Sequence, residues 1–214
     1  MTPHSHNACY AITMPRSKGD HEARRRAVSE AVWRVLTAHG FGGLTLRAVA
    51  AELGATTGLL THYFSGKQEL LTHALDLLDE RTGARARRAA GPGLAGVRAL
   101  LLDVLPLTGD AVTGNRIWVS SWDTALADPA LSAAYARKYG RSRERLRDLV
   151  ADAQRLGELR PGDPARIAEG ALSFTLGLVV QALFDPRAFP PERQAELLDD
   201  HLNALVEPQF RAMR

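Results

Sequence analysis

Hydroxyl, imidazole and phenol groups are concentrated in residues 56–63, where they could form hydrogen bonds with nucleic acid. The candidate contacts are Thr56, Thr57, Gly58, Thr61, His62 and Tyr63. Threonine hydroxyls and methyl groups suit phosphate oxygens and thymine methyls, and His62 can donate to a base edge or to a phosphate. Gly58 permits close approach because it has no side chain. The competing interpretation is that Thr56 only caps a helix and Tyr63 only packs, and we expect both roles for these two residues.

The surrounding sequence predicts two short helices joined by a tight turn. Thr45 is a good N-cap, and the apolar residues after it recur at helical spacing as far as Leu53. Gly54 follows directly, where glycine ends helices in a left-handed conformation. A second helix over residues 56–64 completes a helix-turn-helix, whose second helix lies in the DNA major groove. Arg47 joins Thr45 at the start of the first helix, whose N-terminal amides can hold a phosphate.

The rest of the chain also predicts helices, and the fold class is all-α. Ser65 begins a long connecting helix, with Gln68 as the partner in a capping box. The sequence Gly-Pro-Gly at 91–93 ends that helix and marks the best domain boundary. The other expected helices cover residues 20–39, 94–107, 110–127, 128–156, 163–184 and 190–208. Strands are not expected, because alternating β-branched runs between hairpin turns are absent.

Aromatic residues in the C-terminal half could bind a small molecule. The candidate ligand contacts are Trp118, Trp122, Asp123, Tyr135, Tyr139, Phe174 and Gln181. The two Trp residues are four positions apart, as are the two Tyr residues, so each pair shares a helix face. Such rings beside a carboxylate could enclose a quaternary ammonium through cation–π contacts of about 1–2 kcal/mol per ring. Core packing is the competing interpretation for each single ring, but we expect a pocket within this set.

The sequence contains no arrangement typical of catalysis. Ser120 and Ser121 lack the context of a nucleophile elbow, and neither a Gly-rich phosphate loop nor a paired-histidine metal motif is present. His4, His6 and Cys9 could ligate a metal, but a terminal tail without a fourth ligand is the simpler interpretation. We therefore expect no enzyme activity, no catalytic residues, no metal and no cofactor.

Composition and charge are those of a soluble globular protein, with 45% hydrophobic and 24% charged residues. Residues 1–91 hold 12 Lys and Arg against 8 Asp and Glu, whereas the remainder holds 15 against 16. A basic first part joined to a neutral body fits a DNA-binding module, although a solvated basic surface explains the charge equally well. Cys9 is the single cysteine, which favours a reducing, cytoplasmic location. Polar residues interrupt the longest apolar run, near 172–183, so no membrane span is expected.

Two segments of the chain are similar to a known family. Residues 50–58 (AAELGATTG) and 62–71 (HYFSGKQELL) resemble the DNA-binding domain of the TetR family of transcriptional regulators. The run TTGLLTHYFSGK is most similar to the BetI-type branch of that family. More weakly, residues 116–150 and 171–186 resemble the regulatory domain of the same branch. This resemblance implies a ligand-responsive repressor, with double-stranded operator DNA and a small-molecule effector as its partners.

The resemblance also assigns roles to particular positions. Lys67 matches a family position that contacts a phosphate. Many members carry a phosphate-contacting Tyr where this chain has Thr61, so that contact falls to His62 or Tyr63. The last two long helices of each subunit are implied to form a four-helix homodimer interface. The apolar residues around the whole circumference of the helix expected at 163–184 fit burial on more than one side.

The expected organisation has four parts. Residues 1–19 form a flexible tail, residues 20–66 the helix-turn-helix domain, residues 67–90 the connecting helix, and residues 91–214 the ligand-binding and dimerisation domain. The expected function is that of a DNA-binding transcriptional regulator released from its operator by a small molecule. The alternative is a helical ligand-binding protein or enzyme whose helix-turn-helix serves only packing.

Overall fold

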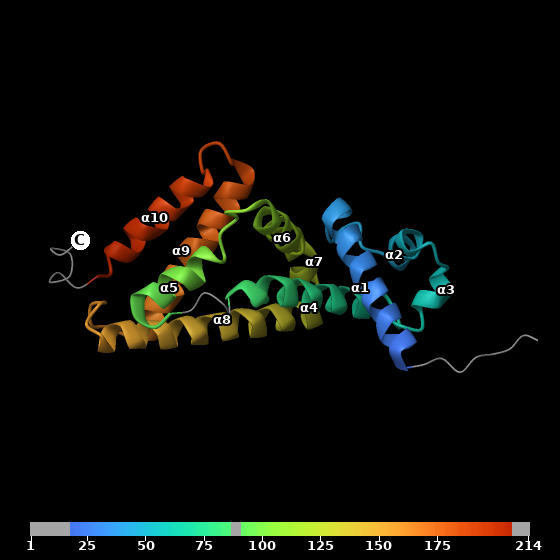
Figure 1. Cartoon of the computed structure of the whole chain (residues 1–214), viewed down its shortest axis with the longest axis horizontal. Coiled ribbons are helices and arrows are strands. Elements are labelled where there is room, and N and C mark those ends of the chain that lie inside the picture. Colours follow the sequence, from blue (N-terminus) through green and yellow to red (C-terminus); the bar gives the residue numbers. More distant parts are fainter. Residues whose placement is uncertain (1–17, 87–90, 207–214) are drawn as a thin grey trace, which may run out of the picture.

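The computed structural model describes residues 18–86 and 91–206, and all of its named elements are helices. In chain order they are α1 (Lys18–His39), α2 (Leu46–Leu53), α3 (Thr57–Leu60), α4 (Lys67–Ala86), α5 (Gly93–Leu102), α6 (Gly109–Ser120), α7 (Trp122–Ala127), α8 (Pro129–Arg155), α9 (Pro164–Phe184) and α10 (Pro191–Asn203). Figure 1 shows α1–α3 at one end, α5–α10 at the other, and α4 extending between them. The fold is therefore all-α, as expected. Most of the expected tail, the last residues of the connecting helix and the C-terminus lie outside the described residues.

The first four helices enclose a small apolar core. Val32 and Leu36 of α1 are buried with Val49 of α2, Leu60 of α3 and Leu70 of α4. Two local signals set the geometry of the turn. The Oγ1 of Thr45 accepts a hydrogen bond from the amide of Ala48 at 3.0 Å, and Gly54 ends α2 in the left-handed region with φ 63°. The helix-turn-helix expected at these residues is therefore present.

The start of α4 differs from the expected capping box. The amide of Ser65 donates to Oε2 of Glu69 at 2.7 Å, rather than to Gln68. Gln68 instead reaches the C-terminal helices, where its Nε2 donates to Oδ1 of Asp128 at 3.0 Å. The expected helix cap at Thr56 is also only positional, since its side chain makes no capping hydrogen bond.

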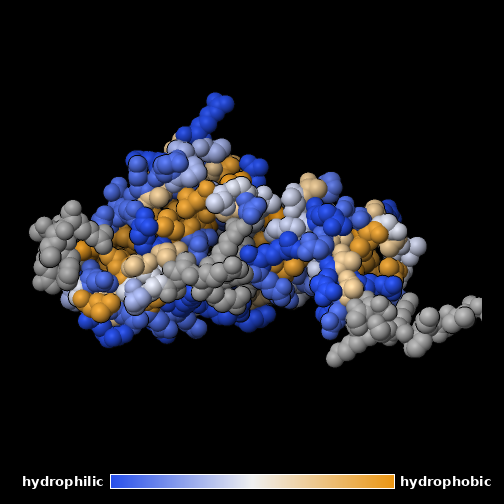
Figure 2. All heavy atoms as spheres, in the orientation of Figure 1, coloured by the Kyte–Doolittle hydropathy of each residue, from blue (hydrophilic) through white to orange (hydrophobic). Residues whose placement is uncertain are grey.

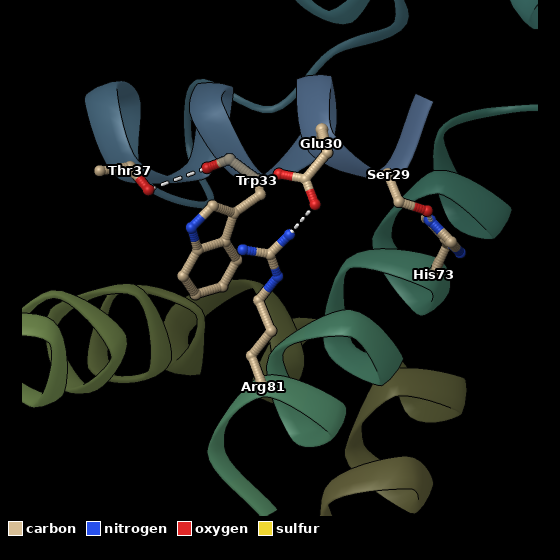
Figure 3. Close-up of polar contacts among 6 residues, drawn as sticks. All are labelled: Ser29, Glu30, Trp33, Thr37, His73 and Arg81. Atoms are coloured by element: carbon tan, nitrogen blue, oxygen red, sulfur yellow. Dashed lines mark hydrogen bonds and ion pairs between the residues drawn. The ribbon is translucent and has the colours of Figure 1, made fainter. Parts of the chain in front are cut away.

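Side-chain contacts hold α1 against α4 (Figure 3). Arg81 of α4 forms an ion pair with Glu30 and lies over the ring of Trp33, with 4.5 Å between its Cζ and the ring centroid. One turn and more toward the N-terminus of α4, Nε2 of His73 lies 3.1 Å from the hydroxyl of Ser29. These contacts make α1 and α4 a continuous unit, so a movement of α4 is transmitted to α1.

Aspartate-proline pairs begin two of the long helices, as the sequence predicts. Oδ1 of Asp128 accepts from the amides of Ala130 and Leu131 at 2.9 and 3.0 Å, at the start of α8. Oδ1 of Asp163 accepts from Ala165 at 2.9 Å in the same way, at the start of α9. Proline is tolerated at the first helical position because its missing N–H would have no partner there.

A single helix was expected over 110–127, but the chain breaks at Ser121 into α6 and α7. The buried hydroxyl of Ser121 donates to the carbonyl oxygen of Trp118 at 2.6 Å and also bonds the hydroxyl of Tyr135. A serine side chain that bonds nearby backbone competes with helix continuation. This break turns α7 toward α8, with which it packs closely.

Helix α9 lies at the centre of the C-terminal part, in contact with α8, α6, α10 and α5. Among the described residues it is the one helix long and apolar enough to cross a membrane by length and composition, because mean hydropathy tolerates its polar interruptions. This is weak evidence, since a core helix has the same properties. Its exposed positions form a strip of mostly small or polar residues, namely Gly170, Ser173, Gly177, Gln181 and Phe184.

Candidate nucleic-acid interface and ligand cavity

Helix α3 has one buried side and one exposed polar side. Leu60 is fully buried and Phe64, just after the helix, is buried beside it. Thr57, Gly58, Thr61 and His62 are all exposed, and their spacing places them together on the opposite side. The apolar anchors therefore fix the helix on the core and leave a surface of hydroxyl and imidazole groups facing outward.

The other two candidates in this segment are less available for contact. Thr56 is exposed at the N-cap position, whereas Tyr63 is half-buried and packs against the core. The hydroxyl of Thr61 donates to the carbonyl oxygen of Gly58 at 2.8 Å. Tyr63 therefore has at least the packing role that the sequence suggested, and the Thr61 hydroxyl keeps its lone pairs for an outside donor.

Exposed groups of the neighbouring helices flank α3. Thr45 and Arg47 lie at the N-terminus of α2, and Lys67 begins α4. Two helix N-termini with a cation on each suit phosphate groups, because the helix dipole and the free amides favour negative charge. Glu69 lies in the same first turn of α4, and its hydrogen bond from the Ser65 amide lowers the pKa of its carboxyl.

A histidine supports α3 from beneath. The ring of His73 lies 5.3 Å from that of Phe64, between centroids, and burial lowers the pKa of His73. The imidazole is therefore neutral at neutral pH and acts as a packing surface for Phe64 and a hydrogen-bond partner of Ser29 (Figure 3). It belongs to the support of the exposed surface rather than to the surface itself.

The C-terminal part contains a cavity of about 390 Å³ enclosed by α4, α5, α6, α8 and α9. This volume lies within the range of about 300–1,000 Å³ typical of small-molecule sites. Its apolar lining consists of Leu78, Leu100, Leu101, Val104, Gly114, Trp118, Leu146, Leu172 and Leu176. Its polar lining consists of Glu80, Asp103, Asn115, Lys138, Tyr139, Arg141, Ser142 and Arg145. A ligand here would contact both a hydrophobic floor and a charged rim.

Four of the seven candidate ligand contacts form one aromatic cluster. The ring centroids of Trp118 and Trp122 are 4.9 Å apart at 80°, and Tyr139 lies 6.1 Å from Trp118 and 6.0 Å from Tyr135. Only Trp118 and Tyr139 line the cavity. Burial raises the pKa of Tyr135 to about 12 and that of Tyr139 still further, so both phenols stay protonated.

The remaining three candidates lie away from the cavity lining. Asp123 and Gln181 are exposed on α7 and α9. Phe174 is half-buried and stacks on the ring of His201 of α10, with centroids 4.2 Å apart and 3° between planes. The carboxylate that was expected beside the rings is therefore not Asp123.

Sequence reasoning missed the basic side of the cavity. Lys138, Arg141 and Arg145 lie three and four residues apart on α8, which places them on one face of the helix. Tyr139 and Ser142 lie among them and also line the cavity. Their periodicity was readable from the sequence, but nothing in the sequence indicated that this face of α8 turns toward α4 and α5.

Comparison with protein families accounts for most of the chain. Residues 29–74 match the family described as bacterial regulatory proteins, tetR family, and residues 94–207 match the C-terminal domain of the BetI-type transcriptional repressor. The chain belongs to the TetR family. It is accordingly a ligand-responsive, DNA-binding transcriptional regulator with a BetI-type C-terminal part.

Individual TetR-family relatives agree with this assignment. The HTH-type transcriptional regulator PksA of Bacillus subtilis is 29% identical over 196 residues, covering 90% of this chain and 94% of the relative. The HTH-type transcriptional regulator BetI of Agrobacterium fabrum is 32% identical over 163 residues, covering 74% and 76%. A transcriptional regulator from Saccharomonospora viridis, solved in complex with choline, has the same fold, with a TM-score of 0.77 at 22% identity over 87% of this chain and 99% of that one.

Proposed function

We propose that this TetR-family protein is a homodimeric repressor, which binds double-stranded operator DNA and leaves it when a small molecule enters the cavity. It acts in the cytoplasm by binding rather than by catalysis. The observation that carries the proposal is the exposed polar side of α3, held outward by the buried Leu60 and Phe64. Only an external partner gives a use to this concentration of donors and acceptors on an otherwise minimal helix.

The proposed division of labour on DNA follows from where each group lies. Thr57, Gly58, Thr61 and His62 contact base edges in the major groove, since they project from the second helix of the motif. The proposed contacts to phosphates come from Thr45, Arg47, Thr56, Tyr63 and Lys67. Phosphate contacts supply much of the affinity and make it salt-dependent, whereas base contacts set the sequence preference.

The proposed dimer forms through α9 and α10. Gly170 and Gly177 lie inside α9, where each costs about 0.5–1 kcal/mol of helix stability relative to alanine. Within the described protomer, a Cβ built on either glycine meets nothing within 4 Å, so the missing side chain serves no internal contact. Phe184, at the end of the same strip, is 82% exposed. Close approach of a second α9 explains both features, and it sets two copies of α3 about 34 Å apart or a multiple of that.

The proposed route from effector to DNA runs through α4 and α6. Leu78 and Glu80 of α4 line the cavity, and the next residue, Arg81, contacts Glu30 and Trp33 of α1 (Figure 3). At the end of α6, Oγ of Ser120 accepts from the amide of Phe41, which follows α1, at 3.3 Å. A ligand that binds one arrangement of these helices more tightly shifts the dimer away from the spacing that fits DNA.

Single substitutions on the proposed surface test the assignment. Lys67→Ala is expected to weaken binding to every DNA sequence by a similar factor and to reduce the slope of log affinity against log salt by about 1. His62→Ala and Thr57→Ala are expected to cost about 1–3 kcal/mol on the preferred sequence and to relax the preference at one base position. Binding is measured by titration on operator variants obtained by selection from a random DNA pool.

A control variant and the alternative function complete this test. Arg147→Ala removes an exposed cation from the far part of α8 and should leave both affinity and preference unchanged. If the three surface variants also bound the selected DNA as the parent does, the reading surface would be misassigned. If no sequence were enriched at all, the alternative of a ligand-binding helical protein or enzyme with a purely structural helix-turn-helix would be favoured.

A further inference from the structure

We propose that the effector is an amphipathic organic anion, carrying a carboxylate or a group of similar charge on a hydrophobic body. This inference rests on the proposed function only in treating the cavity ligand as the effector. Three features of the cavity carry it: an excess of basic side chains on α8, a buried N–H donor in the lining, and an apolar floor.

The first feature is the charge of the lining. Lys138, Arg141 and Arg145 contribute three cations from a single face of α8, whereas Glu80 and Asp103 contribute two carboxylates from α4 and α5. The formal balance of the cavity is therefore positive. A guanidinium presents a planar set of donors that matches a carboxylate in two parallel hydrogen bonds. The cavity thus offers a matching site for an anionic head group.

The second feature is an unused donor. Trp118 is only 8% exposed, lines the cavity, and its Nε1 has no hydrogen-bond partner among the described residues. An indole N–H can only donate, and leaving it buried without an acceptor is unfavourable. A carboxylate supplies an acceptor, whereas a quaternary ammonium has none. The same residue therefore discriminates between the two ligand classes.

The arrangement of the rings also disfavours a cationic ligand. A cation cage needs ring faces turned toward a common point, but Trp118 makes edge contacts with Trp122 and with Tyr139. Tyr139 is protonated because burial raises its pKa, so it adds no negative charge. The leucines and Val104 of the floor instead suit an aliphatic or aromatic body, which burial from water stabilises.

A pair of probes with the same tail and opposite charge provides the test. Octanoate and octyltrimethylammonium are titrated separately into the full-length protein while tryptophan fluorescence and thermal stability are followed. Because Trp118 lines the cavity, a bound probe changes its emission. We expect octanoate to bind saturably and at least about tenfold more tightly than the ammonium probe, the difference that one charge-assisted hydrogen bond produces.

Variants identify the groups responsible. Arg145→Gln and Trp118→Phe should each weaken octanoate binding by about tenfold with little effect on the ammonium probe. Arg143→Gln, on an exposed position of the same helix outside the cavity lining, should change neither. Tighter or equal binding of the ammonium probe, no binding of octanoate, or unchanged octanoate binding in both cavity variants would overturn the anion assignment.

A parallel DNA titration separates this proposal from the proposed function. Ligand-free protein that binds a specific DNA sequence but prefers the ammonium probe would refute only the ligand class. Protein that binds octanoate through Arg145 and Trp118 but no DNA would refute the repressor function and leave the ligand class intact. Release of the DNA by octanoate, and not by the ammonium probe, would support both.

Discussion

An arginine in place of Gly177 is expected to convert the dimer into monomers and to weaken operator binding by about 10²–10⁴-fold, as the two half-sites are then bound independently. The substitution places a long charged side chain on the strip of α9 where we propose that the second subunit packs. Size-exclusion chromatography with light scattering gives the oligomeric state, and a DNA titration gives the affinity for the complete operator and for a half-site.

The protomer itself should tolerate this change, which is why the test is sharp. A Cβ at Gly177 meets nothing within 4 Å, and replacing a glycine inside a helix favours the helix slightly. Gly140→Arg is the matched control, because Gly140 is also inside a helix, on α8, with nothing within 4 Å of a built Cβ. A dimeric Gly177→Arg protein with parental operator affinity would show that the subunits meet elsewhere.

Leu60→Ala is expected to lower the free energy of unfolding of the DNA-binding end by about 2–5 kcal/mol, because Leu60 is fully buried and anchors α3. With only four helical residues, α3 depends on this contact rather than on its own hydrogen bonds for its position. Specific DNA binding should therefore fall by more than the loss of any single surface contact. Chemical denaturation and DNA titration at a temperature where the variant stays folded measure the two effects.

The same substitution at an exposed leucine provides the control. Leu126 on α7 is 82% exposed, so Leu126→Ala should change stability by no more than about 0.5 kcal/mol and leave DNA binding unchanged. Parental stability and DNA affinity in Leu60→Ala would contradict the view that this side chain holds the reading surface in place.

Features that depend on neighbouring residues were predictable from the sequence. Thr45 and Gly54 define the ends of α2, and the two aspartate-proline pairs define the starts of α8 and α9, because each acts through hydrogen bonds within one turn. The exchange of Gln68 for Glu69 in the cap was not predictable in this way. It depends on Gln68 having an alternative partner, Asp128, far along the chain.

Features that depend on tertiary packing were less accessible. The break after α6 follows from the bond between Ser121 and Tyr135, which lie on different helices. Phe174 was grouped with the other aromatic residues, yet its partner is His201 of α10. The basic face of α8 is ordinary for a solvated helix, and it becomes part of a cavity only because α4 and α5 lie opposite. Helical periodicity identifies such a face but not what covers it.

The most direct test of sequence-specific, regulated DNA binding is a gel shift with the DNA that flanks this protein's own gene, performed at two salt concentrations. The account predicts a shift by dimeric protein that weakens at higher salt and survives an excess of nonspecific competitor, and that a cavity ligand reverses. A distant operator is covered by repeating the assay with a random DNA pool. Folded, dimeric protein that shifted neither the flanking DNA nor any selected sequence would contradict the account.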